Sequence, residues 1–158
     1  MDATALAREL IEPIPVNALH GLTVRAAADG AATVELQVGP TLGNAIGSLA
    51  ASGLIAMVDA AGLAAIIATA ERPEELRDVS PLGSDADLTF FAPARGRLRA
   101  HCALDQPALD AVRRLLAGEA DRAAVLTLTE ITDEQRTVVC TGRFRWRIRR
   151  MTPALTAS

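Results

Sequence analysis

Asp59 stands out among the residues that could do chemistry, because it is the only charged residue between Leu42 and Ala70. Burying a carboxylate in apolar, Ala/Gly-rich sequence is costly unless the group is solvated, paired or used. Burial also raises the pKa of a carboxyl group, and a raised pKa suits general-base catalysis. We therefore expect Asp59 to be a general base or nucleophile, or else a hydrogen-bonded carboxylate with a structural or ligand-orienting role.

The element expected to position Asp59 is a long central helix from near Asn44, a favourable N-cap residue, to about Ala70. At ~100° per residue, Ser48 and Ser52 point within about 20° of the direction of Asp59. Such a polar line is typical of a narrow pocket along a helix. The alternatives are that both serines serve close helix packing, and that Asn44 is a plain cap.

Amphipathic segments surround this helix. Alternating apolar residues predict strands that are apolar on one face, which favours an antiparallel sheet packed on one side. The sequence therefore predicts one α+β domain, a curved sheet around the central helix, over residues 1–158 with a core at about 14–150. The expected strands span residues 20–28, 32–38, 86–92, 97–104, 123–131 and 137–149, with helices at 3–12 and 107–119 and a polar loop at 71–84.

This arrangement resembles the hotdog fold of acyl-CoA thioesterases, in particular the PaaI-like branch. Many members carry an Asn, then Gly-[Ser/Thr]-x-His-Gly-Gly, and an acidic residue seven positions after the last Gly. Asn44, Gly47, Ser48 and Asp59 match this pattern in type and spacing. Ala50-Ala51-Ser52 replaces the His-Gly-Gly of the family, so a side chain that often orients the site is missing.

The resemblance implies thioester hydrolysis at a dimer interface, with no cofactor apart from the coenzyme A of the substrate and with no metal. Asn44, Gly47, Ser48, Ala51 and Ser52 would then bind substrate or polarise its carbonyl, since a helix N-terminus offers free N–H groups. On a straight helix Asp59 lies about 16–17 Å from Ser48, so one thioester would need both from two subunits. The expected assembly is a homodimer or a dimer of dimers. The alternative is a non-catalytic module that binds an acyl-CoA or acyl ligand.

Two sets of arginines have the spacing of exposed strand faces. Arg143, Arg145, Arg147 and Arg149 form one set, and Arg95, Arg97 and Arg99 form the other. Both sets fit solvated outer faces, while Arg95 and Arg97 are also candidates for binding the phosphates of coenzyme A. Because the aromatic residues of the last strand alternate to the other face, base stacking beside these arginines is disfavoured.

The remaining composition narrows the function classes. A net charge of −3 gives no reason to expect nucleic acid as a partner. An aspartate near the centre of the long apolar segment argues against membrane insertion, and the N-terminus does not resemble a signal peptide. His20 and His101 are too far apart in sequence for a metal site or a triad, and Cys102 and Cys140 fit buried, reduced thiols. We therefore expect a cytoplasmic protein.

Overall fold

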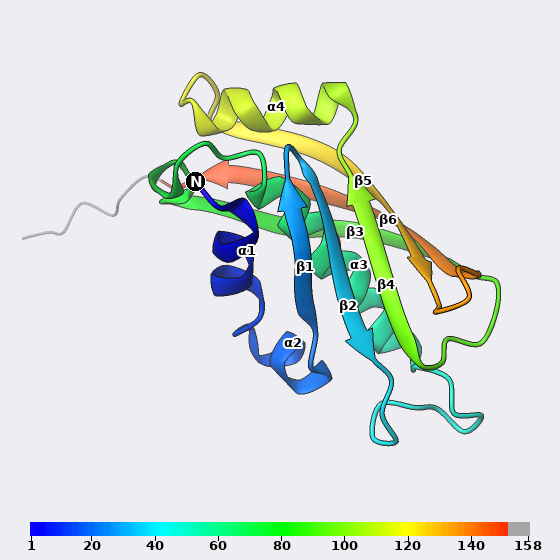
Figure 1. Ribbon diagram of the computed structural model, residues 1–158. Helices are drawn as coiled ribbons and strands as arrows, with labels where there is room; N and C mark the ends of the chain where they lie inside the picture. Colours follow the sequence, from blue (N-terminus) through cyan, green and yellow to red (C-terminus); the bar gives the residue numbers. More distant parts are fainter. Residues whose placement is uncertain (152–158) are drawn as a thin grey trace, which may run out of the picture.

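The structure, a computed structural model, describes residues 1–151 and contains one six-stranded sheet with helix α3 against its inner face (Figure 1). Residues 152–158, the end of the expected domain, lie outside the described part. The elements in chain order are α1 (Ala3–Ile11), α2 (Pro15–His20), β1 (Thr23–Ala28), β2 (Ala31–Gln37), α3 (Ala51–Ile67), the 3-10 helix η1 (Pro73–Leu76), β3 (Val79–Phe90), β4 (Arg97–Ala103), α4 (Gln106–Leu116), β5 (Arg122–Thr132) and β6 (Val138–Arg150).

The strands run in the order β1-β2-β4-β5-β6-β3, and every neighbouring pair is antiparallel. This confirms the expected fold class, a curved antiparallel sheet around one central helix. Strands β1 and β3, which come before and after α3 in the chain, form the two edges of the sheet (Figure 1). In the sequence, helix α3 therefore lies between the two strands that form the edges of the sheet.

The strands bury alternate residues, as their sequence pattern predicts. On β4, Leu98, Ala100 and Cys102 are buried while Arg99 and His101 between them are exposed. Cys102 and Cys140 are both buried free thiols, as expected. Burial raises the pKa of each thiol to about 11, so both stay protonated at neutral pH.

Small residues let α3 approach the sheet closely. A Cβ at Gly62 would lie 2.9 Å from Thr127 Oγ1 and 3.1 Å from two ring atoms of Trp146. The Trp146 indole donates a hydrogen bond to that threonine hydroxyl at 3.0 Å, so the polar atom of a buried aromatic residue is satisfied. The Ala/Gly-rich composition of α3 thus follows from its position against the sheet.

The expected bounds of three elements were wrong. Helix α3 begins at Ala51 and ends at Ile67, whereas a start near Asn44 and an end near Ala70 were expected. Strand β3 begins at Val79, so residues 79–84 belong to a strand and not to the polar loop. Strand β1 begins at Thr23, because the preceding residues form α2, which starts with a proline in its first turn.

Within residues 1–151, none of the helices combines the length and the apolar character that crossing a bilayer requires.

Candidate functional site

Asp59 is the middle residue of α3 and is half-buried. Burial raises the pKa of its carboxyl group above the ordinary aspartate range. Within residues 1–151 the carboxylate forms no hydrogen bond and no ion pair, so nothing in the described chain offsets its desolvation. The carboxylate is therefore perturbed in the direction that favours proton transfer near neutral pH, and it is available to a ligand.

Most of α3 is buried, and its less buried residues form one stripe along the helix. We call this stripe the open face of α3; it consists of Ala51, Ser52, Ile55, Asp59 and Leu63. From Ser52 onward these residues are spaced three or four apart, so they lie on the same side of the helix. Asp59 thus points away from the sheet of its own chain, toward a space that a ligand or a second copy can occupy.

The N-terminus of α3 offers free hydrogen-bond donors beside this open face. Ala50 is the N-cap residue and makes no side-chain cap. The N–H groups of Gly53 and Leu54 bond to the carbonyl of Ala50. Those of Ala51 and Ser52 have no acceptor within residues 1–151, as expected for a first helical turn. Two adjacent N–H groups at the positive end of a helix can stabilise a developing oxyanion.

Asn44 and Ser48 do not belong to this helix, which corrects the sequence prediction. Asn44 caps a turn in the preceding loop, where its side-chain oxygen accepts hydrogen bonds from the N–H groups of Ile46 and Ser48, both at 3.1 Å. Gly47 has a φ of 73°, a left-handed conformation that favours glycine and closes this turn. The local Asx-type turn competes with helix formation, and α3 begins only after it.

Ser48 has a structural contact. Its side chain is buried, and its hydroxyl accepts a hydrogen bond from the backbone N–H of Ala94 at 2.8 Å. The expected polar line of Ser48, Ser52 and Asp59 is therefore reduced to the last two. The distance between Asp59 and the N-terminus of α3 is also shorter than expected. Asp59 is eight residues from Ala51, which is about 12 Å along the axis at ~1.5 Å per residue.

The structure separates the two arginines that were candidates for phosphate binding. Arg95 lies in the loop before β4 and donates a hydrogen bond to the Ile46 carbonyl at 2.8 Å, so it lies next to the turn before α3. Arg97 is exposed on the outer face of β4, the side of the sheet away from α3. Only Arg95 is thus brought near the N-terminal end of α3.

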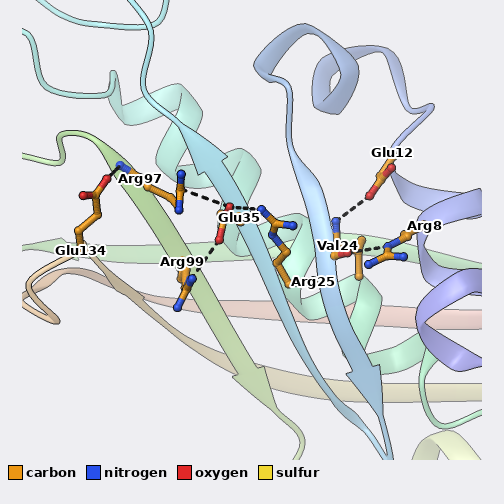
Figure 2. Close-up of polar contacts among 8 residues, drawn as sticks. All are labelled: Arg8, Glu12, Val24, Arg25, Glu35, Arg97, Arg99 and Glu134. Carbon is orange, nitrogen blue, oxygen red and sulfur yellow. Dashed lines mark hydrogen bonds and ion pairs between the residues drawn. The ribbon is translucent and has the colours of Figure 1, made fainter.

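A charged cluster on that outer face was not found from the sequence. The Glu35 side chain is nearly buried and lies among three arginines, as Figure 2 shows. Its carboxylate lies 2.5 Å from Arg25, 3.1 Å from Arg99 and 3.6 Å from Arg97. The hydrogen bond from Arg25 is the main reason that the pKa of Glu35 is lowered. Strand register could have indicated the cluster, because Glu35 pairs directly with Arg99.

Comparison with known proteins supports the assignment of the fold. A family model described as "Domain of unknown function (DUF4442)" matches residues 14–148. A solved structure from Pseudomonas aeruginosa, named a probable thioesterase, is 26% identical with a TM-score of 0.76, over 92% of this chain and 95% of that chain. A thioesterase from Haemophilus influenzae is 14% identical with a TM-score of 0.73, over 96% and 94%. Among curated proteins there is no match.

These similarities agree with the architecture described above, an antiparallel sheet with a central helix. The chain belongs to the DUF4442 family, and its fold is the hotdog fold of the thioesterase superfamily.

Proposed function

We propose that this protein hydrolyses an acyl-CoA thioester at a site between two copies of the chain. The observation that carries the proposal is Asp59, a half-buried carboxylate with a raised pKa and no partner within residues 1–151. The names of the similar structures from Pseudomonas aeruginosa and Haemophilus influenzae support thioester hydrolysis as the reaction class.

A site between two copies is favoured because Asp59 and the free N–H groups of Ala51 and Ser52 are too far apart in one chain. Along the helix they are separated by about 10–12 Å, whereas a general base and an oxyanion site must both lie within about 3 Å of the reacting groups. Two antiparallel copies of α3, facing each other through their open faces, would bring Asp59 of one chain to the helix N-terminus of the other.

Edge strand β3 offers a surface on which such a pair could form. It is 12 residues long and pairs with β6 on one side only. Leu82 on this strand is 61% exposed, and Phe90 and Phe91 at its end are 55% and 61% exposed. A long edge strand with exposed apolar side chains is a template for pairing with another strand. We propose that β3 pairs with β3 of a second copy to form the homodimer.

In the proposed reaction, Asp59 removes a proton from a water molecule that attacks the thioester carbonyl carbon. The N–H groups of Ala51 and Ser52 from the other copy stabilise the oxyanion that forms. When the tetrahedral intermediate collapses, the carbon–sulfur bond breaks and the thiolate takes the proton from Asp59. Direct attack by the Asp59 carboxylate, followed by hydrolysis of the mixed anhydride, uses the same geometry. Arg95 is the candidate for binding a phosphate of coenzyme A.

The test is a thiol-release assay with purified protein and a chain-length series of acyl-CoAs, comparing wild type with Asp59→Asn. The substitution keeps the shape of the side chain and removes the base, so kcat should fall by about 10²–10⁴-fold. Asp110→Asn is the matched control, because this exposed aspartate on α4 only accepts a hydrogen bond from Gln106.

Unchanged turnover in Asp59→Asn would refute the assignment of Asp59. The replacement of His-Gly-Gly by Ala50-Ala51-Ser52 favours one alternative, a hotdog module that binds an acyl-CoA without hydrolysing it. Thermal stabilisation by an acyl-CoA without release of thiol would support that alternative and reject hydrolysis.

A further inference from the structure

An apolar groove lies beside the C-terminal half of α3. Its volume is about 420 Å³, and it is bounded by α1, α3, η1 and the beginning of β3. Its apolar lining comes mainly from Leu6, Leu10, Leu63, Ile66, Leu76 and Val79. Two exposed charged residues, Glu9 and Arg77, also border it. A concave apolar surface of this size is in the range of small-molecule sites.

The groove continues the open face of α3 that carries Asp59. Leu63 follows Asp59 by four residues and Ile66 follows it by seven, which places them about 6 Å and 10 Å further along the same side of the helix. A linear molecule whose reactive end lies at Asp59 can therefore extend along α3 into the groove. The α3 residues that line the groove, Leu63, Ile66 and Ile67, are all apolar and suit an apolar chain.

We propose that this groove holds the hydrocarbon chain of the acyl group, so that the substrate is an unsubstituted, medium-length acyl thioester. The identity of the ligand as a substrate rests on the proposed function. The length follows from geometry. From Asp59 to Ile67 is about 12 Å along the helix, and an extended chain with C–C bonds of ~1.5 Å and angles of ~111° advances about 1.25 Å per carbon. The path from Asp59 to the end of the groove thus accommodates about eight to ten carbons, of which roughly the last half lie within the groove itself. Polar or charged acyl groups are disfavoured, because the lining is mostly apolar and its two charged residues, Glu9 and Arg77, are exposed to solvent.

The test measures binding without turnover, by calorimetry with S-alkyl-CoA thioethers from ethyl to tetradecyl, which cannot be hydrolysed. Each methylene that enters the groove should increase the affinity by about two- to fourfold. The increase should begin after butyl and stop near decyl, where the groove ends. Equal affinity for ethyl-CoA and decyl-CoA would overturn the inference.

Two variants fill the groove and one serves as their control. Leu63→Trp narrows it next to the catalytic end, and Leu76→Trp narrows it from η1, so the second remains informative if the first does not fold. Each should lower decyl-CoA affinity at least tenfold. Leu76→Trp, which lies outside the open face of α3, should also leave ethyl-CoA binding within twofold. Leu19→Trp on α2 is the control, because Leu19 is 76% exposed and outside the groove lining. Both ligands should bind this variant as they bind wild type.

The outcomes separate the two proposals. If affinity depends on chain length, the tryptophan variants remove that dependence, and acyl-CoAs release no thiol, then the groove is supported as the binding site and hydrolysis is rejected. If acyl-CoAs release thiol but affinity does not depend on chain length, then hydrolysis is supported and the groove is rejected as the acyl site. If Leu63→Trp and Leu76→Trp instead change the mass of the assembly in sedimentation while decyl-CoA affinity stays constant, the groove contacts a second copy and the inference is overturned.

Discussion

The close contact between α3 and β6 predicts that Gly142→Ala destabilises the fold, even though the change adds one methyl group. A Cβ at Gly142 would lie 2.5 Å and 2.7 Å from the two Cγ atoms of Val58. Carbon atoms in contact are normally about 3.5–4.0 Å apart, so helix and strand must separate by roughly 1 Å or the valine must change its rotamer. Val58 precedes Asp59 directly, and a shift here would also move the candidate base.

The expected cost combines two effects. Overpacking a well-packed core costs about 1–3 kcal/mol. Alanine is better than glycine inside a strand by about 0.5–1 kcal/mol. At the middle of both ranges the net loss in the free energy of unfolding is about 1–1.5 kcal/mol, which for a domain of this size lowers Tm by about 2–6 °C.

The assay is urea unfolding followed by circular dichroism, with Gly39→Ala as the matched control. A Cβ at Gly39 meets nothing within 4 Å, and Gly39 is not among the glycines with positive φ, so the control should be neutral or slightly stabilising. The double variant Val58→Ala/Gly142→Ala supplies a second check, because truncating the valine makes room for the new methyl. We expect a favourable coupling of at least about 1 kcal/mol between the two substitutions. A Gly142→Ala protein as stable as wild type, or strictly additive effects in the double variant, would refute the close packing that holds Asp59 in place.

Three further predictions concern single polar groups. Burial raises the pKa of Asp59, so the protein is most stable below the pKa of an unfolded aspartate and loses stability as the pH rises through the pKa of the folded state. Asp59→Asn should therefore have a higher Tm than wild type at pH 7, by about 2–4 °C for each kcal/mol gained, and no advantage in acid. Glu35 has a lowered pKa, so Glu35→Gln should cost about 1–2 kcal/mol at pH 7 in urea unfolding, and its difference from wild type should shrink as pH falls from the ordinary glutamate range through the lowered pKa. Ser48→Ala leaves the N–H of Ala94 without its acceptor and should lower the free energy of unfolding by about 1–3 kcal/mol. Ser52→Ala, at an exposed helical position, should change it by less than about 0.5 kcal/mol. Equal effects of the two substitutions would contradict the hydrogen bond between Ser48 and Ala94.

The sequence predicted the elements whose two faces differ in environment. Strands β2, β4, β5 and β6 and helix α4 appear within a few residues of their expected ranges, because each has one face on the core and one in solvent. The first half of β3 was missed because it is an edge strand with little burial on either face, so residues 79–84 show no alternation. A segment without a buried face leaves no periodic signal.

The start of α3 was misplaced for a different reason. Asn44 has the chemistry of a helix cap, but its side chain closes a turn within the preceding loop. The true N-cap, Ala50, has no side chain able to cap, so nothing in the sequence identifies it. Position 59 was nevertheless predicted on the correct element, because the absence of other charges over the whole segment does not depend on where the helix begins.

The placement of Asp59 indicates why a carboxylate persists in this helix at all. Twelve of the seventeen residues of α3 are buried against the rest of the chain, and a charged group at any of those positions would be desolvated without a partner. Only the open face tolerates a carboxylate, and even there burial raises its pKa while residues 1–151 supply no compensating hydrogen bond. An alanine at this position would favour both the helix and its packing. A group that costs stability and forms no hydrogen bond or ion pair within residues 1–151 is best explained by an interaction made outside its own chain, with a ligand at the end of the apolar groove or with the helix N-terminus of a second copy. The proposed site places both of these next to the same two carboxylate oxygens.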